Sequence, residues 1–139
     1  MSILIDTNVI LDIFLKREPF FSDSYLAFRT ATETGTDCYV SSSSVTDIFY
    51  ILRKALQSSS MAKKYISDLM QLVSLADVLG SDIMDALASD MPDFEDAVAD
   101  AIAKRTGAVC ILTRNTKDFA QGTVSAITPT EYVKRYRYS

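Results

Sequence analysis

The chain has 139 residues, 48% of them hydrophobic, with a formal net charge of −4 at pH 7 and no histidine. This size and apolar content predict one globular domain over residues 1–139 with a sizeable core. The lack of histidine excludes imidazole catalysis and histidine–metal sites, and the acidic balance argues against a basic nucleic-acid platform, although a bound divalent cation could supply positive charge locally.

The first half of the chain alternates short apolar runs with helical periodicity, the pattern of strand–helix units and a parallel sheet. Strands are predicted at residues 2–5 and 38–41. The periodicity predicts helices at about 8–16, 19–35, 45–56 and 61–73.

The second half continues this α/β pattern. A weak strand is expected at 75–78, and strands are expected at 109–112 and 124–127. Helices are predicted from Ser81 or Asp82 to about 89, from Pro92–Asp93 to a C-cap at Gly107, and from Thr128–Pro129 onward.

The two cysteines and the lengths of the apolar runs indicate the cellular compartment of the protein. Cys38 and Cys110 lie in predicted strands without metal-ligand spacing, so both are expected to be small core residues. Asp6 interrupts the first apolar run, so no signal peptide is expected, and no uninterrupted run reaches the roughly 18–20 residues of a membrane helix. A cytoplasmic protein without a membrane partner is therefore expected.

Two acids stand next to predicted strand ends, where open α/β sheets bind ligands. Asp6 follows the first strand and is equally suited to cap the next helix. Asp47 closes the sequence Ser44-Val45-Thr46-Asp47, which has the spacing of a capping box and favours a cap over a ligand.

Three further acids share a helix face. Asp93, Asp96 and Asp100 project within roughly 60° of one another at about 100° per residue, away from the apolar stripe that begins at Phe94. Such carboxylates repel one another. Asp93 suits an N-cap, and the face as a whole is either a hydrated acidic surface or a cation site.

A fourth polar group follows the strand at 109–112. Thr113 has a hydroxyl that could bond a carboxylate, while Asn115 and Asp118 could be ordinary turn residues. Strand ends and the helix starts after them share one edge of a parallel sheet, so these groups should open toward one crevice. Several carboxylates without histidine suit Mg²⁺ or Mn²⁺.

Four segments together resemble the PIN domain, the metal-dependent ribonuclease fold of VapC-type toxins. They are Ile3-Leu4-Ile5-Asp6-Thr7-Asn8-Val9-Ile10-Leu11-Asp12, Ser44-Val45-Thr46-Asp47-Ile48, Asp93-Phe94-Glu95-Asp96-Ala97 and Ile111-Leu112-Thr113-Arg114-Asn115-Thr116-Lys117-Asp118-Phe119. The resemblance implies a three-layer α/β/α sandwich with a central, mainly parallel sheet of four to five strands.

The resemblance also implies the site. Asp6, Asp47 and Asp96 match the family's first three acids, with aspartate at a second position that is often glutamate. Asn115 stands where the fourth acid is common, so either Asn115 or the nearby Asp118 would complete the metal site or hold a second ion. Thr7, Asn8, Thr113 and Asn115 would orient carboxylates and waters, and Asp93 and Asp100 are additional candidates.

The implied activity is a Mg²⁺- or Mn²⁺-dependent endoribonuclease that leaves a 5′-phosphate and a 3′-hydroxyl. Its implied partners are RNA, a small antitoxin protein and a second copy of the chain. The alternative is a PIN domain that only binds RNA or protein, its site degraded by Asp47 and Asn115. Two other classes of α/β protein fit the sequence less well. A dehalogenase-like phosphatase would need an aspartate at position 8, where this chain has Asn8, and a receiver domain would need paired acids after the first strand, which this chain lacks.

Overall fold

Five short parallel strands form the centre of the computed structural model, which describes residues 1–138. The strands are β1 (Ser2–Ile5), β2 (Asp37–Ser41), β3 (Ser74–Ala76), β4 (Ile111–Leu112) and β5 (Ala126–Ile127). Their order across the sheet is β3-β2-β1-β4-β5, and all four pairings are parallel. The expected parallel α/β sheet is thus confirmed.

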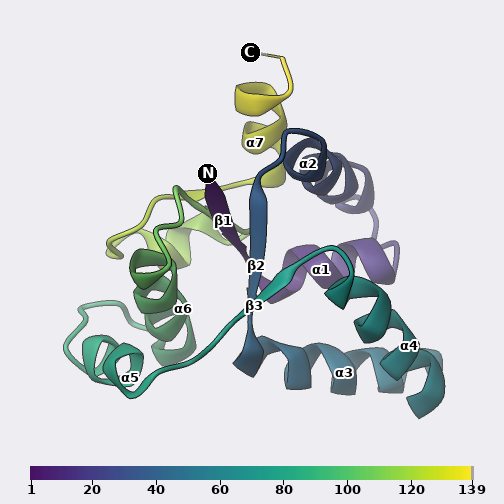
Figure 1. Ribbon diagram of the computed structural model, residues 1–139, viewed down its shortest axis with the longest axis horizontal. Coiled ribbons are helices and arrows are strands. Elements are labelled where there is room, and N and C mark those ends of the chain that lie inside the picture. Colours follow the sequence, from purple (N-terminus) through teal and green to yellow (C-terminus); the bar gives the residue numbers. More distant parts are fainter. Residues whose placement is uncertain (139) are drawn as a thin grey trace.

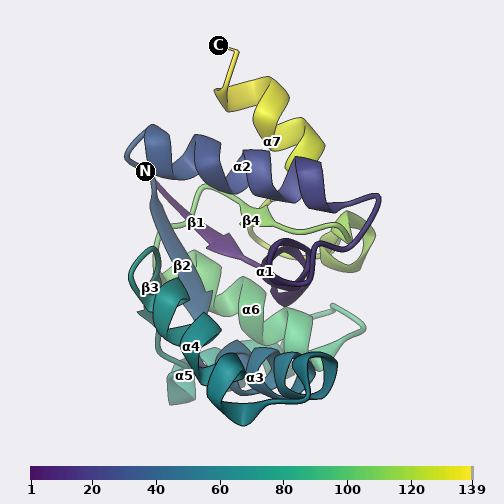
Figure 2. The ribbon, with the colours of Figure 1, turned by 90° about the vertical axis from the view of Figure 1, so that its right-hand side faces the viewer.

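Helices cover both faces of this sheet (Figures 1 and 2). They are α1 (Thr7–Phe14), α2 (Phe21–Glu33), α3 (Ser42–Leu56), α4 (Ser59–Met70), α5 (Gly80–Leu87), α6 (Phe94–Arg105) and α7 (Pro129–Tyr136). Figure 1 views the sheet from its edge, with α5 and α6 on one side and α1, α2, α3 and α4 on the other. The three-layer sandwich expected from the resemblance is therefore present.

Two apolar cores hold the layers together. Ile3, Ile5 and Val40 point to the larger core, which α1, α2, α3, α4 and α7 cover. Leu4 and Ile111 point to the other face, under α5 and α6. This alternation along β1 follows from the two-residue period of a strand, and both faces are apolar because helices bury both.

Several local expectations differ from the structure. The strand expected at 109–112 is shorter, because Val109 is 46% exposed and precedes β4. Phe94, expected on the apolar stripe of α6, is 47% exposed, while Ala97, Val98, Ala101 and Ile102 are buried. A 3-10 helix, η1 (Thr116–Phe119), follows β4 where only a turn was expected.

The two cysteines and Gly107 lie as expected. Cys38 and Cys110 are free thiols buried in the interior, and burial raises the pKa of each to about 11. Gly107 lies just after α6 with φ +72°, the left-handed conformation that glycine adopts without a Cβ clash. Of the helices in residues 1–138, none is long and apolar enough to span a bilayer.

The chain reverses its direction across the sheet at the β1–β4 boundary. From β1 it moves to β2 and β3 through helices on one face, then crosses to β4 on the other side of β1. Ligands of open α/β sheets bind outside the strand carboxyl ends at such a switch point. Asp6 follows β1 and Thr113 follows β4, so both lie there.

Candidate active site

Asp6 is held at the switch point by hydrogen bonds to both of its carboxylate oxygens. The Thr7 backbone N–H donates to Oδ1 at 2.8 Å, which caps α1, and the Thr113 hydroxyl donates to Oδ2 at 2.8 Å. Burial raises the pKa of the Asp6 carboxyl, and these two hydrogen bonds oppose the rise because they favour the charged form. Asp6 is therefore both a helix cap and a fixed carboxylate at the sheet edge.

Asn8 and Thr113 connect the two strand ends. The Asn8 Nδ2 donates to Asp6 Oδ2 and to Thr113 Oγ1, both at 3.4 Å. Asn8 Oδ1 accepts from the Arg114 backbone N–H at 3.3 Å, and Thr113 Oγ1 accepts from the Asn115 N–H at 3.1 Å. Asn8 and Thr113 therefore both contact the Asp6 carboxylate, the position from which they could orient it.

Asp96 lies in the first turn of α6. Asp93 is the N-cap of this helix and accepts from the Asp96 backbone N–H at 2.9 Å. Burial, together with the charges of Asp93, Asp6, Asp118 and Glu95, raises the pKa of Asp96 to about 7. A shift of this size, caused by burial and several like charges, marks a candidate functional site.

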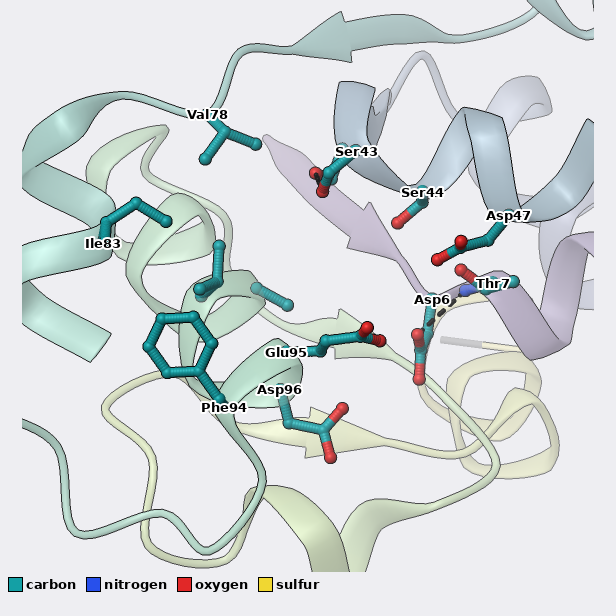
Figure 3. Close-up of a pocket in the computed structure, with 13 residues that line it drawn as sticks. Asp6, Thr7, Ser43, Ser44, Asp47, Val78, Ile83, Phe94, Glu95 and Asp96 are labelled. Atoms are coloured by element: carbon teal, nitrogen blue, oxygen red, sulfur yellow. Dashed lines mark hydrogen bonds between the residues drawn. The ribbon is translucent and has the colours of Figure 1, made fainter. Parts of the chain in front are cut away.

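A pocket of about 340 Å³ opens at this edge of the sheet (Figure 3). Four acids line it, and in the close-up their carboxylates face a common space: Asp6, Asp47, Glu95 and Asp96. Ser43, Ser44 and Thr7 add hydroxyl groups to its wall, while Val78, Ile83 and Phe94 form an apolar side. The pocket therefore gathers carboxylates from the residue directly after β1, from α3 and from α6.

Asp47 is not a helix cap, contrary to the interpretation that its spacing favours. Helix α3 begins earlier, at Ser42, with Ser41 as its N-cap, so Asp47 lies in the second turn. Its side chain lines the pocket instead. The capping-box spacing gave the wrong helix start because four consecutive serines offer several possible N-caps for α3. The end of the strand Asp37–Ser41 determines which serine is the N-cap.

Asp118 and Asn115 occupy different environments within the segment after β4. Asp118 lies in η1, and its charge contributes to the raised pKa values of both Asp6 and Asp96. Asn115 precedes η1, its side chain is exposed and forms no capping hydrogen bond, and its backbone N–H contacts Thr113. The charge of Asp118 thus acts on Asp6 and Asp96, although neither Asp118 nor Asn115 lines the pocket.

Asp93 and Asp100 do not line the pocket. The Asp93 carboxylate is engaged as the cap of α6. Asp100 is buried one turn beyond Asp96, and both of its oxygens accept hydrogen bonds from Thr123, with Val124 as a further donor. The expectation that Asp100 shares one open face with Asp93 and Asp96 is therefore wrong, because a loop distant in sequence covers it.

Three residues near the site were not identified from the sequence. Glu95 lines the pocket and raises the pKa of Asp96.

The other two form an ion pair. Asp12 is fully buried and pairs with Arg114, whose Nε lies 2.7 Å from Asp12 Oδ2. The guanidinium of Arg114 lies 3.9 Å from the centre of the Phe20 ring, and its charge acts to lower the pKa of Asp6. The position of Arg114, directly after the strand-end residue Thr113, was the sequence signal that could have identified this arginine as part of the site.

The donor set fits a hard divalent cation by its chemistry. The pocket offers carboxylate and hydroxyl oxygens without nitrogen or sulfur ligands, which suits Mg²⁺ or Mn²⁺. Among residues 1–138, no three acidic side chains converge closely enough to enclose a cation in their present rotamers. Mg²⁺ sites generally use one or two carboxylates and retain waters, so a complete protein cage is not required.

A parallel sheet with an acidic pocket at its switch point defines a class of α/β proteins, and the chain matches one family of that class. Residues 2–117 match the family model described as PIN domain. The chain therefore belongs to the PIN domain family, as the resemblance predicted.

Particular relatives cover nearly all of the chain. Ribonuclease VapC1 of Aquifex aeolicus (strain VF5) is 27% identical over 142 residues, which span 96% of this chain and 94% of that protein. VapBC2 from Rickettsia felis, solved bound to a DNA fragment from its promoter, superposes with a TM-score of 0.75 at 12% identity and covers 92% of this chain and 98% of that one. A toxin–antitoxin complex from Klebsiella pneumoniae gives a TM-score of 0.68 at 22% identity and covers 92% and 98%.

Proposed function

We propose that this PIN-domain protein is an endoribonuclease that depends on a divalent metal ion. The observation that carries the proposal is the acidic pocket at the β1–β4 switch point, which Asp6, Asp47 and Asp96 line and whose acids Asp6 and Asp96 feel the charge of Asp118. The similarity to Ribonuclease VapC1 along almost the whole chain supports RNA as the substrate.

In this proposal Asp6, Asp47 and Asp96, which line the pocket, hold Mg²⁺ or Mn²⁺, and Asp118 completes the site from η1. These carboxylates would hold the cation, which would supply positive charge against the phosphodiester and would activate water for its hydrolysis. Thr113 and Asn8 keep the Asp6 carboxylate oriented through the hydrogen bonds to Oδ2. Thr7 acts through its backbone N–H.

The raised pKa of Asp96 supports the same assignment. Carboxylates that repel one another in the protein alone lose that repulsion when a cation binds among them. Cation binding should therefore release a proton from Asp96 near neutral pH, because its pKa lies at about 7 before binding. The electrostatic energy stored in the cluster thus favours a bound cation.

A cleavage assay on a mixture of RNA substrates tests the function. We expect cleavage with Mn²⁺, and none with EDTA or with the Asp6→Asn variant. The matched control is Asp37→Asn, because Asp37 is exposed at the start of β2, the edge opposite the pocket. RNA binding without cleavage by the wild-type protein would contradict the enzyme and support the RNA-binding alternative.

We further propose that the protein is a toxin held inactive by a small antitoxin protein and that it forms homodimers. The toxin–antitoxin complex from Klebsiella pneumoniae, which has the same fold, supports the antitoxin partner, whereas the homodimer rests on the family resemblance. Co-expression with the product of the neighbouring gene, followed by light scattering and the cleavage assay, tests both points. A monomeric chain whose cleavage is unaffected by that product would contradict them.

A further inference from the structure

Asp100 is a buried carboxylate whose hydrogen bonds come from one loop. It is 5% exposed and lies in the middle of α6. Its Oδ1 accepts from the backbone N–H groups of Thr123 and Val124, both at 2.9 Å. Its Oδ2 accepts from the Thr123 N–H at 3.0 Å and the Thr123 hydroxyl at 2.9 Å. This donor set matches the acceptor-only character of an ionised carboxylate.

Gly122 allows the loop to come this close to Asp100. A Cβ at position 122 would lie 2.7 Å from Asp100 Oδ1 and 3.1 Å from the Phe119 carbonyl oxygen. Neither atom can move away easily, because Asp100 is fixed by its hydrogen bonds and the Phe119 carbonyl accepts from the Gly122 N–H at 2.9 Å. The close approach therefore requires glycine at position 122.

The loop that Asp100 holds is continuous with the segment that carries Asp118. Phe119, the last residue of η1, is buried in the core beneath α6. Gly122 follows three residues later, and Thr123 and Val124 donate to Asp100, so η1 packs against α6 through Phe119 and the loop directly after it is hydrogen-bonded to α6. Asp96 lies one turn before Asp100 on the same helix. Asp100 thus joins the element that bears Asp96 to the element that bears Asp118.

We propose that Asp100 is a positioning residue for the acidic site: by anchoring the loop at 122–124 to α6, it sets the location of Asp118 relative to Asp96 and Asp6. The inference rests on the proposed function in that these acids together hold the cation. It assigns Asp100 a role through the loop rather than as a ligand.

The Asp100→Asn variant tests the anchor with little change in volume. The substitution replaces an acceptor oxygen with an NH₂ group that faces N–H or O–H donors, so at least one hydrogen bond is lost. We expect the dissociation constant for Mn²⁺, measured by electron paramagnetic resonance of the free ion, to rise about 10- to 100-fold, the range for changes in residues that support metal ligands. Thr123→Val, which removes only the hydroxyl, should give a smaller rise.

Asp82→Asn is the matched control. Asp82 is also a buried aspartate and pairs with Arg105, but it lies on α5, and its hydrogen bonds come from Arg105 and the Leu79 N–H rather than from η1 or the loop that follows it. The Asp82→Asn variant should lower the melting temperature while changing the Mn²⁺ dissociation constant less than about twofold. If Asp100→Asn lowers only the melting temperature and leaves Mn²⁺ affinity within about twofold of wild type, the positioning role is refuted.

Amide hydrogen exchange gives a readout that does not need the metal. In η1 the Asp118 N–H donates to the Asn115 carbonyl at 3.1 Å, and the Ala120 N–H donates to the Lys117 carbonyl at 3.2 Å. Both amides should exchange at least about tenfold faster in Asp100→Asn, whereas Asp82→Asn should leave them unchanged relative to other amides; unchanged exchange in Asp100→Asn would overturn the proposal. If the wild-type protein binds no Mn²⁺, the proposed metal site fails, and the exchange rates alone decide whether Asp100 positions Asp118.

Discussion

Asp96 connects the electrostatics of the pocket to protein stability. Its pKa of about 7 lies above the ordinary value of 3.8, so the folded protein favours the protonated form. The stability contributed by this group is fully present below its pKa in the unfolded chain and is lost as pH rises from about 4 to about 7. The asparagine side chain of the Asp96→Asn variant has no charge to gain over that interval.

The first prediction is that Asp96→Asn stabilises the metal-free protein in a pH-dependent way. In EDTA, the variant's advantage in free energy of unfolding should grow between about pH 4 and pH 7 and then stay constant. Urea denaturation at several pH values measures it. A difference in free energy of unfolding that does not depend on pH would show that burial and neighbouring charges do not raise the pKa of Asp96.

Thr113 contributes one hydroxyl to the site, and its removal has a local cost. Thr113 is fully buried, and its hydroxyl donates to Asp6 and accepts from the Asn115 N–H. We predict that Thr113→Val lowers the free energy of unfolding by about 1–2 kcal/mol, because buried polar partners lose a hydrogen bond. Thr113→Ser keeps the hydroxyl, removes only the methyl group and should lose less; a loss in Thr113→Val no larger than that in Thr113→Ser would contradict a dominant role of the hydroxyl.

At the scale of elements, the Asp12–Arg114 pair fastens α1 to the segment after β4. Asp12 is fully buried and also accepts from the Ser24 hydroxyl of α2 at 3.3 Å, so this carboxylate joins three parts of the chain. Arg114 follows Thr113, and its backbone N–H bonds Asn8. The pair therefore supports the same strand end that positions Asp6.

We predict that Arg114→Met destabilises the protein by about 3–5 kcal/mol, because it leaves the Asp12 charge buried and unpaired. The double variant Asp12→Asn with Arg114→Met removes that charge and should recover part of the loss. Thermal and urea unfolding of the single and double variants measures the coupling. Additive losses would mean that the two side chains do not stabilise each other.

The elements that could be predicted are those with a strong local signal. The five strands and seven helices follow from apolar runs and helical periodicity, with shifts of a few residues at their ends. Helix α3 starts earlier than expected because β2 leads directly into it at Ser41. The 3-10 helix η1 has only four residues, too few for a periodic pattern.

The part of the site that could be predicted consists of residues that directly follow a strand in the sequence and therefore lie at the edge of the sheet. Asp6 and Thr113 immediately follow strands, so their meeting follows from the parallel sheet. The role of Asp100 could not be foreseen, because its partners are 23 and 24 residues away and reach it only through tertiary packing. The pairing of Asp12 with Arg114, separated by 102 residues, has the same cause.

For the whole molecule, the proposed cation site predicts that cation binding is coupled to folding. A cation that binds only the folded state stabilises it by about 2.7 kcal/mol at about 100 times its dissociation constant. We predict that Mn²⁺ at that concentration raises the melting temperature by about 5–10 °C, as followed by circular dichroism. The rise should disappear with excess EDTA and shrink in Asp96→Asn; an equal rise in that variant would place the cation elsewhere.

The rate of RNA cleavage by Asp96→Asn, under single-turnover conditions with saturating Mn²⁺, tests the central claim most directly. The variant should fold at least as well as the wild type, because it removes a charge that its neighbours repel. We expect its cleavage rate to fall at least about 100-fold, while Asp37→Asn cleaves at the wild-type rate. An Asp96→Asn protein that cleaves RNA as fast as the wild type would contradict the assignment of this pocket as the active site.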